Sequence, residues 1–165
     1  MSFNILIDPN PALRTRCKEV NLEEYRKSSS LQDEIYEKFS TMHKIMIEQN
    51  GIGLAANQIG LLERIIVIDL NPDRDHDLLE RDVLFMINPI INHYSNKKTL
   101  LEEGCLSVNQ QLVQVSRPDS IVCTYFTING KQKTIKARGL LAKVIQHEID
   151  HLNGKLIIDF LDEEN

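Results

Sequence analysis

The residues with the clearest chemical potential are His147, Glu148 and His151, which form an H-E-x-x-H pattern inside the stretch 146–154. On a helix, side chains four positions apart lie on the same face, so both imidazoles can reach one metal ion. Glu148 lies beside the first histidine, where its carboxylate can border the metal without being a ligand. In such an arrangement a metal activates a water molecule and a carboxylate handles its proton, so the pattern predicts a catalytic metal centre.

A solvated helix without any metal is the alternative, because short motifs also arise by chance. The local sequence favours the metal site. The residues LLAKVIQ before His147 create an apolar face, which predicts a partly buried amphipathic helix from Leu140 to about Asn153. Gly154 follows as the expected C-terminal cap of this helix.

Two histidines make an incomplete catalytic site, because such sites usually have three protein ligands and one open position. In the longer protease pattern the third ligand lies downstream, but Ile157 occupies that position here. The other downstream candidates are the acidic residues Asp159, Asp162, Glu163 and Glu164. Cys105 is the better candidate, because Gly104 allows a close backbone approach and a thiolate binds borderline or soft metals strongly. A Cys/His₂ set suits zinc as well as iron.

Composition indicates an ordinary globular chain. With 165 residues, of which 42% are hydrophobic and 26% charged, we expect a single domain over residues 1–165. No apolar run is long enough to span a bilayer, and the N-terminal residues are not expected to be a signal peptide. The net charge of -5 gives no basic footprint for nucleic acid. The 3 cysteines are an odd number without paired spacing, which favours a reducing cytoplasm over a disulfide framework.

The pattern of elements predicts an α+β fold, in which antiparallel or mixed strands pack around the ligand helix and another helix lies near the N-terminus. Apolar residues at helical spacing over 31–46 predict that second helix, with Ser30 as its N-cap and Gly51 after its end. Asn129 and Gly130 predict a two-residue hairpin turn. Strands are expected at the runs 64–70, 83–91, 112–115, 121–128 and 131–137.

Several other notable residues are predicted to be structural. His43 is expected at the surface and Cys123 in the core. Pro89 indicates an edge or a bulge in its strand. The charged segment 71–82 is expected to be a solvated loop, because its Asp and His residues lack ligand spacing. The segment GIGLAANQIG, residues 51–60, indicates either a backbone that passes close to another group or a simple connection from helix to strand.

Three separated motifs agree with one family. GIGLAANQ (51–58), EGCLS (103–107) and QHEIDH (146–151) have the order and separations found in the peptide deformylases, and the chain resembles that family over nearly its whole length. A single motif of this length is unspecific, whereas the three together are very specific. The resemblance implies an enzyme that removes the N-formyl group from the initiator methionine of new polypeptides and releases formate.

The resemblance also implies which residues hold the metal. Cys105, His147 and His151 would be the protein ligands, with water as the fourth. The cofactor would be one divalent ion, with ferrous iron as the physiological one and zinc, nickel or cobalt as substitutes in purified protein.

Catalytic roles follow from the same resemblance. Glu148 would take a proton from the attacking water and pass it to the leaving amine. The side-chain amide of Gln58 and the backbone N–H of Leu106 would meet the negative charge that develops on the formyl oxygen. An amide suits this task, because it donates a hydrogen bond without adding net charge.

Substrate-binding residues are implied as well. Ile52, Leu140 and Val144 would line the pocket for the methionine side chain, although their pattern alone would place the last two in the core. Gly53, Glu103 and the strand around Leu106 would contact the peptide, whose backbone would bind in extended form as an added strand.

The sequence departs from the family pattern around the second motif. Asn109 stands where most members have proline, and Leu112 stands nearest to an arginine that in many members approaches the substrate backbone. We expect both differences to affect peptide affinity and not the metal chemistry. The implied partners are nascent polypeptides near the ribosome. The acidic tail ending at Asn165 takes the place of the basic C-terminal helix through which many members would dock. We expect a cytoplasmic monomer that binds neither membrane nor nucleic acid directly.

Two other functions remain open from the residues alone. A zinc endopeptidase would also use H-E-x-x-H, but it would need the downstream third ligand that is missing here. A structural metal site in a peptide-binding module would need neither Glu148 nor Gln58, so the presence of both favours catalysis.

Overall fold

The computed structural model describes residues 3–71 and 83–161 of the chain. The helices are α1 (Leu22–Lys27), α2 (Ser29–Glu48) and α3 (Gly139–Leu152), with short 3-10 helices η1 (Pro11–Arg14), η2 (Ala56–Ile59) and η3 (Ile157–Leu161). The strands are β1 (Gly53–Ala55), β2 (Ile65–Ile68), β3 (Leu84–Tyr94), β4 (Lys98–Cys105), β5 (Val108–Pro118), β6 (Ser120–Phe126) and β7 (Gln132–Arg138). No helix in these two ranges is both long and apolar enough to cross a membrane.

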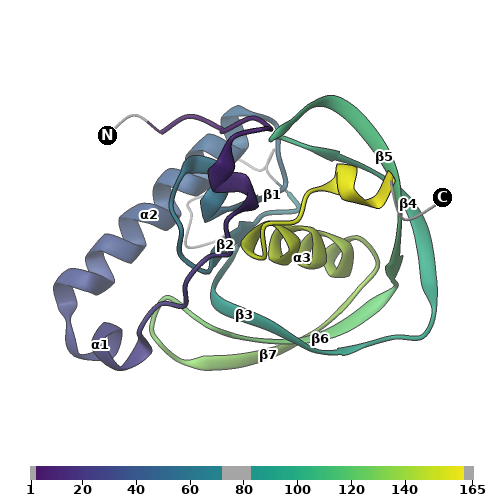
Figure 1. The fold of residues 1–165 in the computed structure, drawn as a ribbon. Coiled ribbons are helices and arrows are strands. Elements are labelled where there is room, and N and C mark those ends of the chain that lie inside the picture. Colours follow the sequence, from purple (N-terminus) through teal and green to yellow (C-terminus); the bar gives the residue numbers. More distant parts are fainter. Residues whose placement is uncertain (1–2, 72–82, 162–165) are drawn as a thin grey trace.

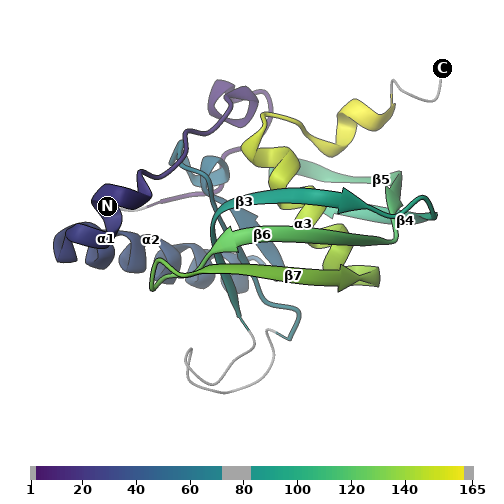
Figure 2. The same cartoon turned by 90° about the horizontal axis from the view of Figure 1, so that it is seen from below.

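The helix α3 lies in the middle of the molecule, with the strands around it (Figures 1 and 2). Antiparallel pairing forms a five-stranded sheet in the order β1-β2-β3-β6-β7, while β4 and β5 form a separate two-stranded sheet. Apolar residues of α3 pack against the larger sheet, where Ile145 and Ile149 join Ile66 and Ile121 in one core cluster. The predicted α+β fold, with antiparallel strands around the ligand helix, is confirmed.

The helix α2 is the one predicted near the N-terminus, and its buried residues include Ile35 and Phe39 as the apolar spacing required. Its predicted N-cap was wrong by two positions. Ser28 is the cap, and its side-chain oxygen accepts a hydrogen bond from the Leu31 N–H at 3.2 Å, whereas Ser30 lies inside the first turn. The short helix α1 directly before this cap was not predicted.

The hairpin between β6 and β7 is present, but its turn is one residue longer than predicted. The Gly130 N–H donates to Thr127 O at 2.8 Å, so Ile128 and Asn129 are the two central residues of the turn. Gly130 follows with a φ of 69°, a backbone conformation that favours glycine. The Asn-Gly pair therefore marked the hairpin correctly, while the loop has the three-residue form that ends in a left-handed residue.

Other single-residue predictions have mixed outcomes. His43 is buried and not at the surface, because its Nε2 pairs with Asp69 Oδ2 at 3.0 Å behind the end of β2. Cys123 is a core thiol as predicted. The pairing of β3 with β6 shifts its register between Ile87 and Ile90, which confirms the bulge expected at Pro89. Most of the predicted loop 71–82 lies outside the described residues.

The end of α3 is fixed by a close backbone approach. Asn153 is its C-cap and Gly154 follows with a φ of 76°, as the sequence predicted. A Cβ atom at position 154 would lie 2.5 Å from Arg14 O, so a larger residue would push the N-terminal segment away. The ligand helix is thereby held against that segment.

Candidate metal centre and pocket

Three side chains with ligand atoms converge beside α3. The helix places His147 and His151 one turn apart, with their Nε2 atoms 3.2 Å from each other. Strand β4 ends at Cys105, whose Sγ lies 3.2 Å from His151 Nε2. The three ligand atoms lie within 4.8 Å of one another, and no other such group occurs among the described residues. One sulfur and two imidazole nitrogens at these separations fit a single four-coordinate ion with an open position.

A buried ion-pair network orients the first histidine. His147 Nδ1 donates to Glu103 Oε2 at 2.9 Å, which turns the opposite ring nitrogen toward Cys105 and His151. Arg117 in turn donates to both Glu103 oxygens, at 2.6 and 3.0 Å, and to Asp150 Oδ2 at 2.7 Å. The network therefore joins β4, β5 and the ligand helix around one imidazole.

Burial and neighbouring charges shift the pKa of both imidazoles. Burial, and then the charge of His147, hold the pKa of His151 well below its ordinary value, which favours the neutral form that binds metals. Burial also opposes a charge on His147, but hydrogen bonds to Cys105 and Glu103 outweigh it and raise the pKa of this ring to about 10. Because only a neutral imidazole binds a metal, an ion at this site would have to displace the extra proton of His147.

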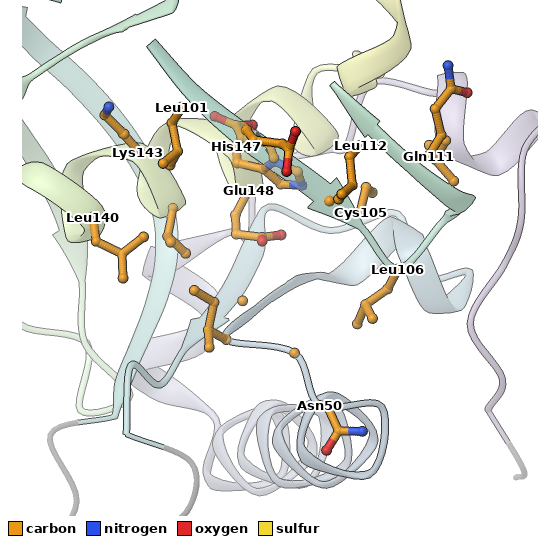
Figure 3. A pocket seen from close by; sticks show the side chains of 18 of the residues that line it. Asn50, Leu101, Cys105, Leu106, Gln111, Leu112, Leu140, Lys143, His147 and Glu148 are labelled. Atoms are coloured by element: carbon orange, nitrogen blue, oxygen red, sulfur yellow. Dashed lines mark hydrogen bonds and ion pairs between the residues drawn. The ribbon is translucent and has the colours of Figure 1, made fainter. Parts of the chain in front are cut away.

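Glu148 points into the pocket beside the ligands (Figure 3). Its side chain is only 4% exposed, and within the described residues its Oε2 has no hydrogen-bond donor. Burial raises the pKa of this carboxyl to about 7, which suits a group that must take up and return a proton near neutral pH. A cation held by the three ligands would lower this pKa, because it favours the carboxylate.

The amide of Gln58 is fixed in a defined orientation. Its Oε1 accepts a hydrogen bond from the Ala55 N–H at 2.9 Å, and its Nε2 donates to Ser107 Oγ at 3.1 Å. The same nitrogen lies 3.9 Å from Cys105 Sγ. Gln58 comes from η2 and Cys105 from β4, so the fold brings the first two motifs into contact at the metal ligands.

A cavity of about 610 Å³ opens onto these groups. Its wall includes Ile52, which precedes β1, and Gly53, the first residue of β1, as well as Val144 on α3. Leu140 on α3 and Leu106 after β4 also line it (Figure 3). All five predicted substrate-binding residues border it, including Glu103. The Glu103 carboxylate, however, accepts hydrogen bonds from Arg117 and His147. Only the backbone of this residue is therefore left to contact a ligand.

The chain is similar to known proteins over nearly its whole length. The family model described as polypeptide deformylase matches residues 2–165. Peptide deformylase 2 of Gloeobacter violaceus is 38% identical over 159 residues, which cover 96% of this chain and 83% of that protein. The chain belongs to the peptide deformylase family. The peptide deformylase of Pelagibacter ubique is 40% identical over 158 residues, covering 96% of this chain and 85% of the relative.

Solved structures of the family have the same fold. A probable peptide deformylase from Synechococcus phage S-SSM7 superposes with a TM-score of 0.82 and 38% identity, covering 96% of this chain and 99% of the other. The enzyme of Thermotoga maritima superposes with a TM-score of 0.80 and 31% identity, covering 96% and 97%. Membership makes the chain an enzyme, a peptide deformylase, and the family consists of metalloenzymes, which agrees with the ligand group described above.

Three residues of the deformylase site were not singled out from the sequence. Asn57 donates from its side chain to His151 O at 2.6 Å, and Ser107 accepts from Gln58. Both lie inside the motifs, so their motif membership could have indicated them. Arg117 gave no such signal, because it lies outside every motif and reaches Glu103 and Asp150 only through the fold.

Gly53 leads to a first prediction. A Cβ atom there would overlap Glu148 Oε1 and lie 2.9 Å from Val144 Cγ1. Gly53→Ala should therefore displace the Glu148 carboxylate and lower kcat at least ~10-fold, since shifts of about 1 Å in catalytic groups are costly. Steady-state kinetics with parallel metal analysis measures this effect. A variant with wild-type kcat would show that the new methyl group displaces β1 and leaves the Glu148 carboxylate in place.

Proposed function

We propose that this chain hydrolyses the formyl amide of N-formylmethionyl polypeptides through Glu148 and Gln58, acting beside a metal ion held by Cys105, His147 and His151. The observation that carries this proposal is the meeting of the three motifs at one largely apolar pocket. A metal-ligand group, a buried carboxylate and an oriented amide all border the same cavity, and family membership supplies the reaction class.

Cys105, His147 and His151 are the proposed ligands of one divalent ion, with ferrous iron as the natural one and zinc, nickel or cobalt as substitutes. A bound ion would lower the pKa of a water molecule and polarise the formyl carbonyl. Elemental analysis of protein purified without oxygen tests which ion is present.

Glu148 is the proposed proton carrier. It takes one proton from the attacking water, whose oxygen adds to the formyl carbon, and delivers that proton to the nitrogen when the carbon–nitrogen bond breaks. Formate and a free methionine amine are the products. The buried position of the carboxylate and its elevated pKa support this role.

Gln58 and Leu106 are the proposed donors to the formyl oxygen as it becomes negative. The Ala55 and Ser107 contacts hold the Gln58 amide in place before the reaction, so no reorganisation is needed as the charge develops. Leu106 directly follows Cys105 and borders the same pocket, which supports its backbone N–H as the second donor.

The methionine side chain is proposed to enter the apolar part of the pocket, between Ile52 on one side and Leu140 and Val144 on α3. Leu140 and Val144 are one helical turn apart and therefore border the same space. Gly53 and the end of β4 are proposed to pair with the peptide backbone as an added strand.

Formate release from a formyl-methionyl tripeptide tests the proposed function. The matched control is the acetyl-methionyl tripeptide, which adds one methyl group at the reacting carbon and should be cleaved far more slowly. Digestion of casein by the same preparation, without formate release, would favour an endopeptidase instead.

Residues 1–165 are further proposed to form a single catalytic domain that works as a cytoplasmic monomer on nascent chains near the ribosome. The family match over residues 2–165 supports the domain, and the free cysteines Cys17, Cys105 and Cys123 support a reducing compartment. Light scattering on the purified chain tests the monomer.

Leu112 leads to a second prediction. It borders the pocket and is 61% exposed, and it stands nearest to the arginine that many members use to approach the substrate backbone. Leu112→Arg should lower the KM for formyl-methionyl peptides and leave kcat similar, because the new contact would form equally in ground and transition states.

Leu100→Arg is the matched control for this change. Leu100 is equally exposed, at 61%, but lies on β4 outside the residues that line the pocket. An equal fall in KM for both variants would point to general charge attraction instead of a local contact.

A further inference from the structure

The N-terminal stretch 6–17 makes backbone hydrogen bonds to the first two motifs and to the residue that follows the third. Its amide groups donate to the following backbone oxygens: Leu6 to Gln58 at 2.7 Å, Asp8 to Ser107 at 2.9 Å and Cys17 to Leu152 at 2.8 Å. The first two acceptors belong to the first and second motifs, and the third directly follows His151 of the last motif. One short stretch thus connects segments that are distant in sequence.

Two of these acceptors coincide with the proposed donors to the formyl oxygen. Gln58 carries one donor on its side chain, and Ser107 directly follows Leu106, whose N–H is the other. Ser107 Oγ also accepts the Gln58 amide at 3.1 Å. The residues Leu6–Asp8 therefore bridge the two backbone segments whose separation decides where the two donors lie.

This bridge is anchored and is not a loose chain end. Leu6 packs with Cys105 and Val108 in one apolar cluster, where Leu13 is fully buried. Farther along, Arg14 pairs with both Asp159 oxygens, at 2.8 and 2.7 Å. The bridging residues are thus fixed on one side by packing and on the other by an ion pair.

We propose that the backbone N–H groups of Leu6 and Asp8 form a positioning element for this reaction, which sets the spacing of the Gln58 and Leu106 donors through their two hydrogen bonds. The inference rests on the proposed function. Hydrogen bonds to a developing oxyanion act over roughly 2.7–3.1 Å. A small change in the spacing of the two segments therefore weakens the hydrogen bonds from both donors in the transition state. Neither Gln58 nor Leu106 belongs to the group of candidate metal ligands, so we expect the ion to stay bound.

Leu6→Pro tests this element, because proline has no N–H to donate to Gln58 O. We expect kcat for formate release to fall at least ~10-fold, with KM within about twofold and metal content unchanged, since only transition-state contacts are lost. Ile7→Pro is the matched control. Its N–H makes none of the three bonds and its side chain is exposed, so its kcat should stay close to that of the wild type.

A double-mutant cycle separates positioning from general destabilisation. A Gln58→Ala background lacks the side-chain amide that Leu6 is proposed to position. Leu6→Pro should therefore reduce kcat much less in this background than it does in the wild type. A fall of the same size in both backgrounds, or an unchanged kcat for Leu6→Pro alone, would overturn the inference.

An amide-to-ester replacement at Leu6 covers the case in which the proline variant does not fold. Cys17 is a natural ligation site, so a synthetic segment 1–16 can be joined to residues 17–165 with no other change. The ester replaces the N–H by an oxygen that cannot donate, so it should reproduce the loss of kcat, while an ester at Ile7 should not. A wild-type chain that releases no formate would overturn the proposed function, whereas an active chain with an unaffected Leu6 ester would overturn this inference alone.

Discussion

Glu148→Gln is expected to lower kcat for deformylation by at least ~10², the usual scale of general acid–base catalysis, while the metal stays bound. Gln is nearly isosteric with Glu and should leave the packing against Gly53 intact. It cannot accept a proton from water. The carboxylate lies beside the three ligands without belonging to their group, so its loss should not release the ion.

Metal content and kinetics must be measured on the same preparation of this variant. Glu148→Asp is the matched control, because it keeps a carboxylate but shortens the side chain by one methylene, and it should retain more activity than Glu148→Gln. If Glu148→Gln turns over normally with a full complement of metal, another group carries the proton. If it loses the ion, Glu148 is itself a ligand.

Cys105→Ala is expected to abolish activity by lowering the metal content well below one ion per chain. Only His147 and His151 would remain, and two protein ligands are fewer than catalytic sites normally provide. This loss differs in kind from that of Glu148→Gln, because the ion itself is missing. Elemental analysis after gel filtration measures it directly.

Cys123→Ala is the control for the cysteine substitution. It deletes the same sulfur from a fully buried position in β6, outside the ligand group, and should keep one ion per chain. Any destabilisation it causes reflects a small cavity, at a cost on the order of 1 kcal/mol. The assignment of Cys105 as a ligand would be wrong if Cys105→Ala retained as much metal as Cys123→Ala.

The local parts of the site follow from the sequence because they depend on short-range geometry. His147 and His151 face one way because a helix repeats every 3.6 residues, and the apolar face of that helix set its depth in the molecule. The glycine in front of Cys105 and the close-approach signal of Gly53 were also visible in the sequence. Which groups would approach Gly53 was not, since Glu148 and Val144 lie on a helix about ninety residues away.

Errors in the sequence prediction share a physical cause. Ser28 and Ser30 are both acceptable N-caps by residue type, and only the folded backbone shows that the Ser28 hydroxyl accepts the hydrogen bond from the Leu31 N–H. His43 was assigned to the surface because histidine is often found there. Its burial is possible only because the end of β2 brings Asp69 to its ring.

The sequence by itself determined the candidate ligand group, the helix that carries its two histidines with its glycine cap, five of the seven described strands and the family of this protein. Each of these depends on residue type, on spacing along one element or on motifs read in order. Only the tertiary structure decided that the Glu103 carboxylate accepts hydrogen bonds from His147 and Arg117. It also decided that the N-terminal stretch joins Gln58 to Ser107. These contacts link segments on different elements, and no periodicity of the chain encodes them, because they exist only once packing has brought β4, β5 and α3 together.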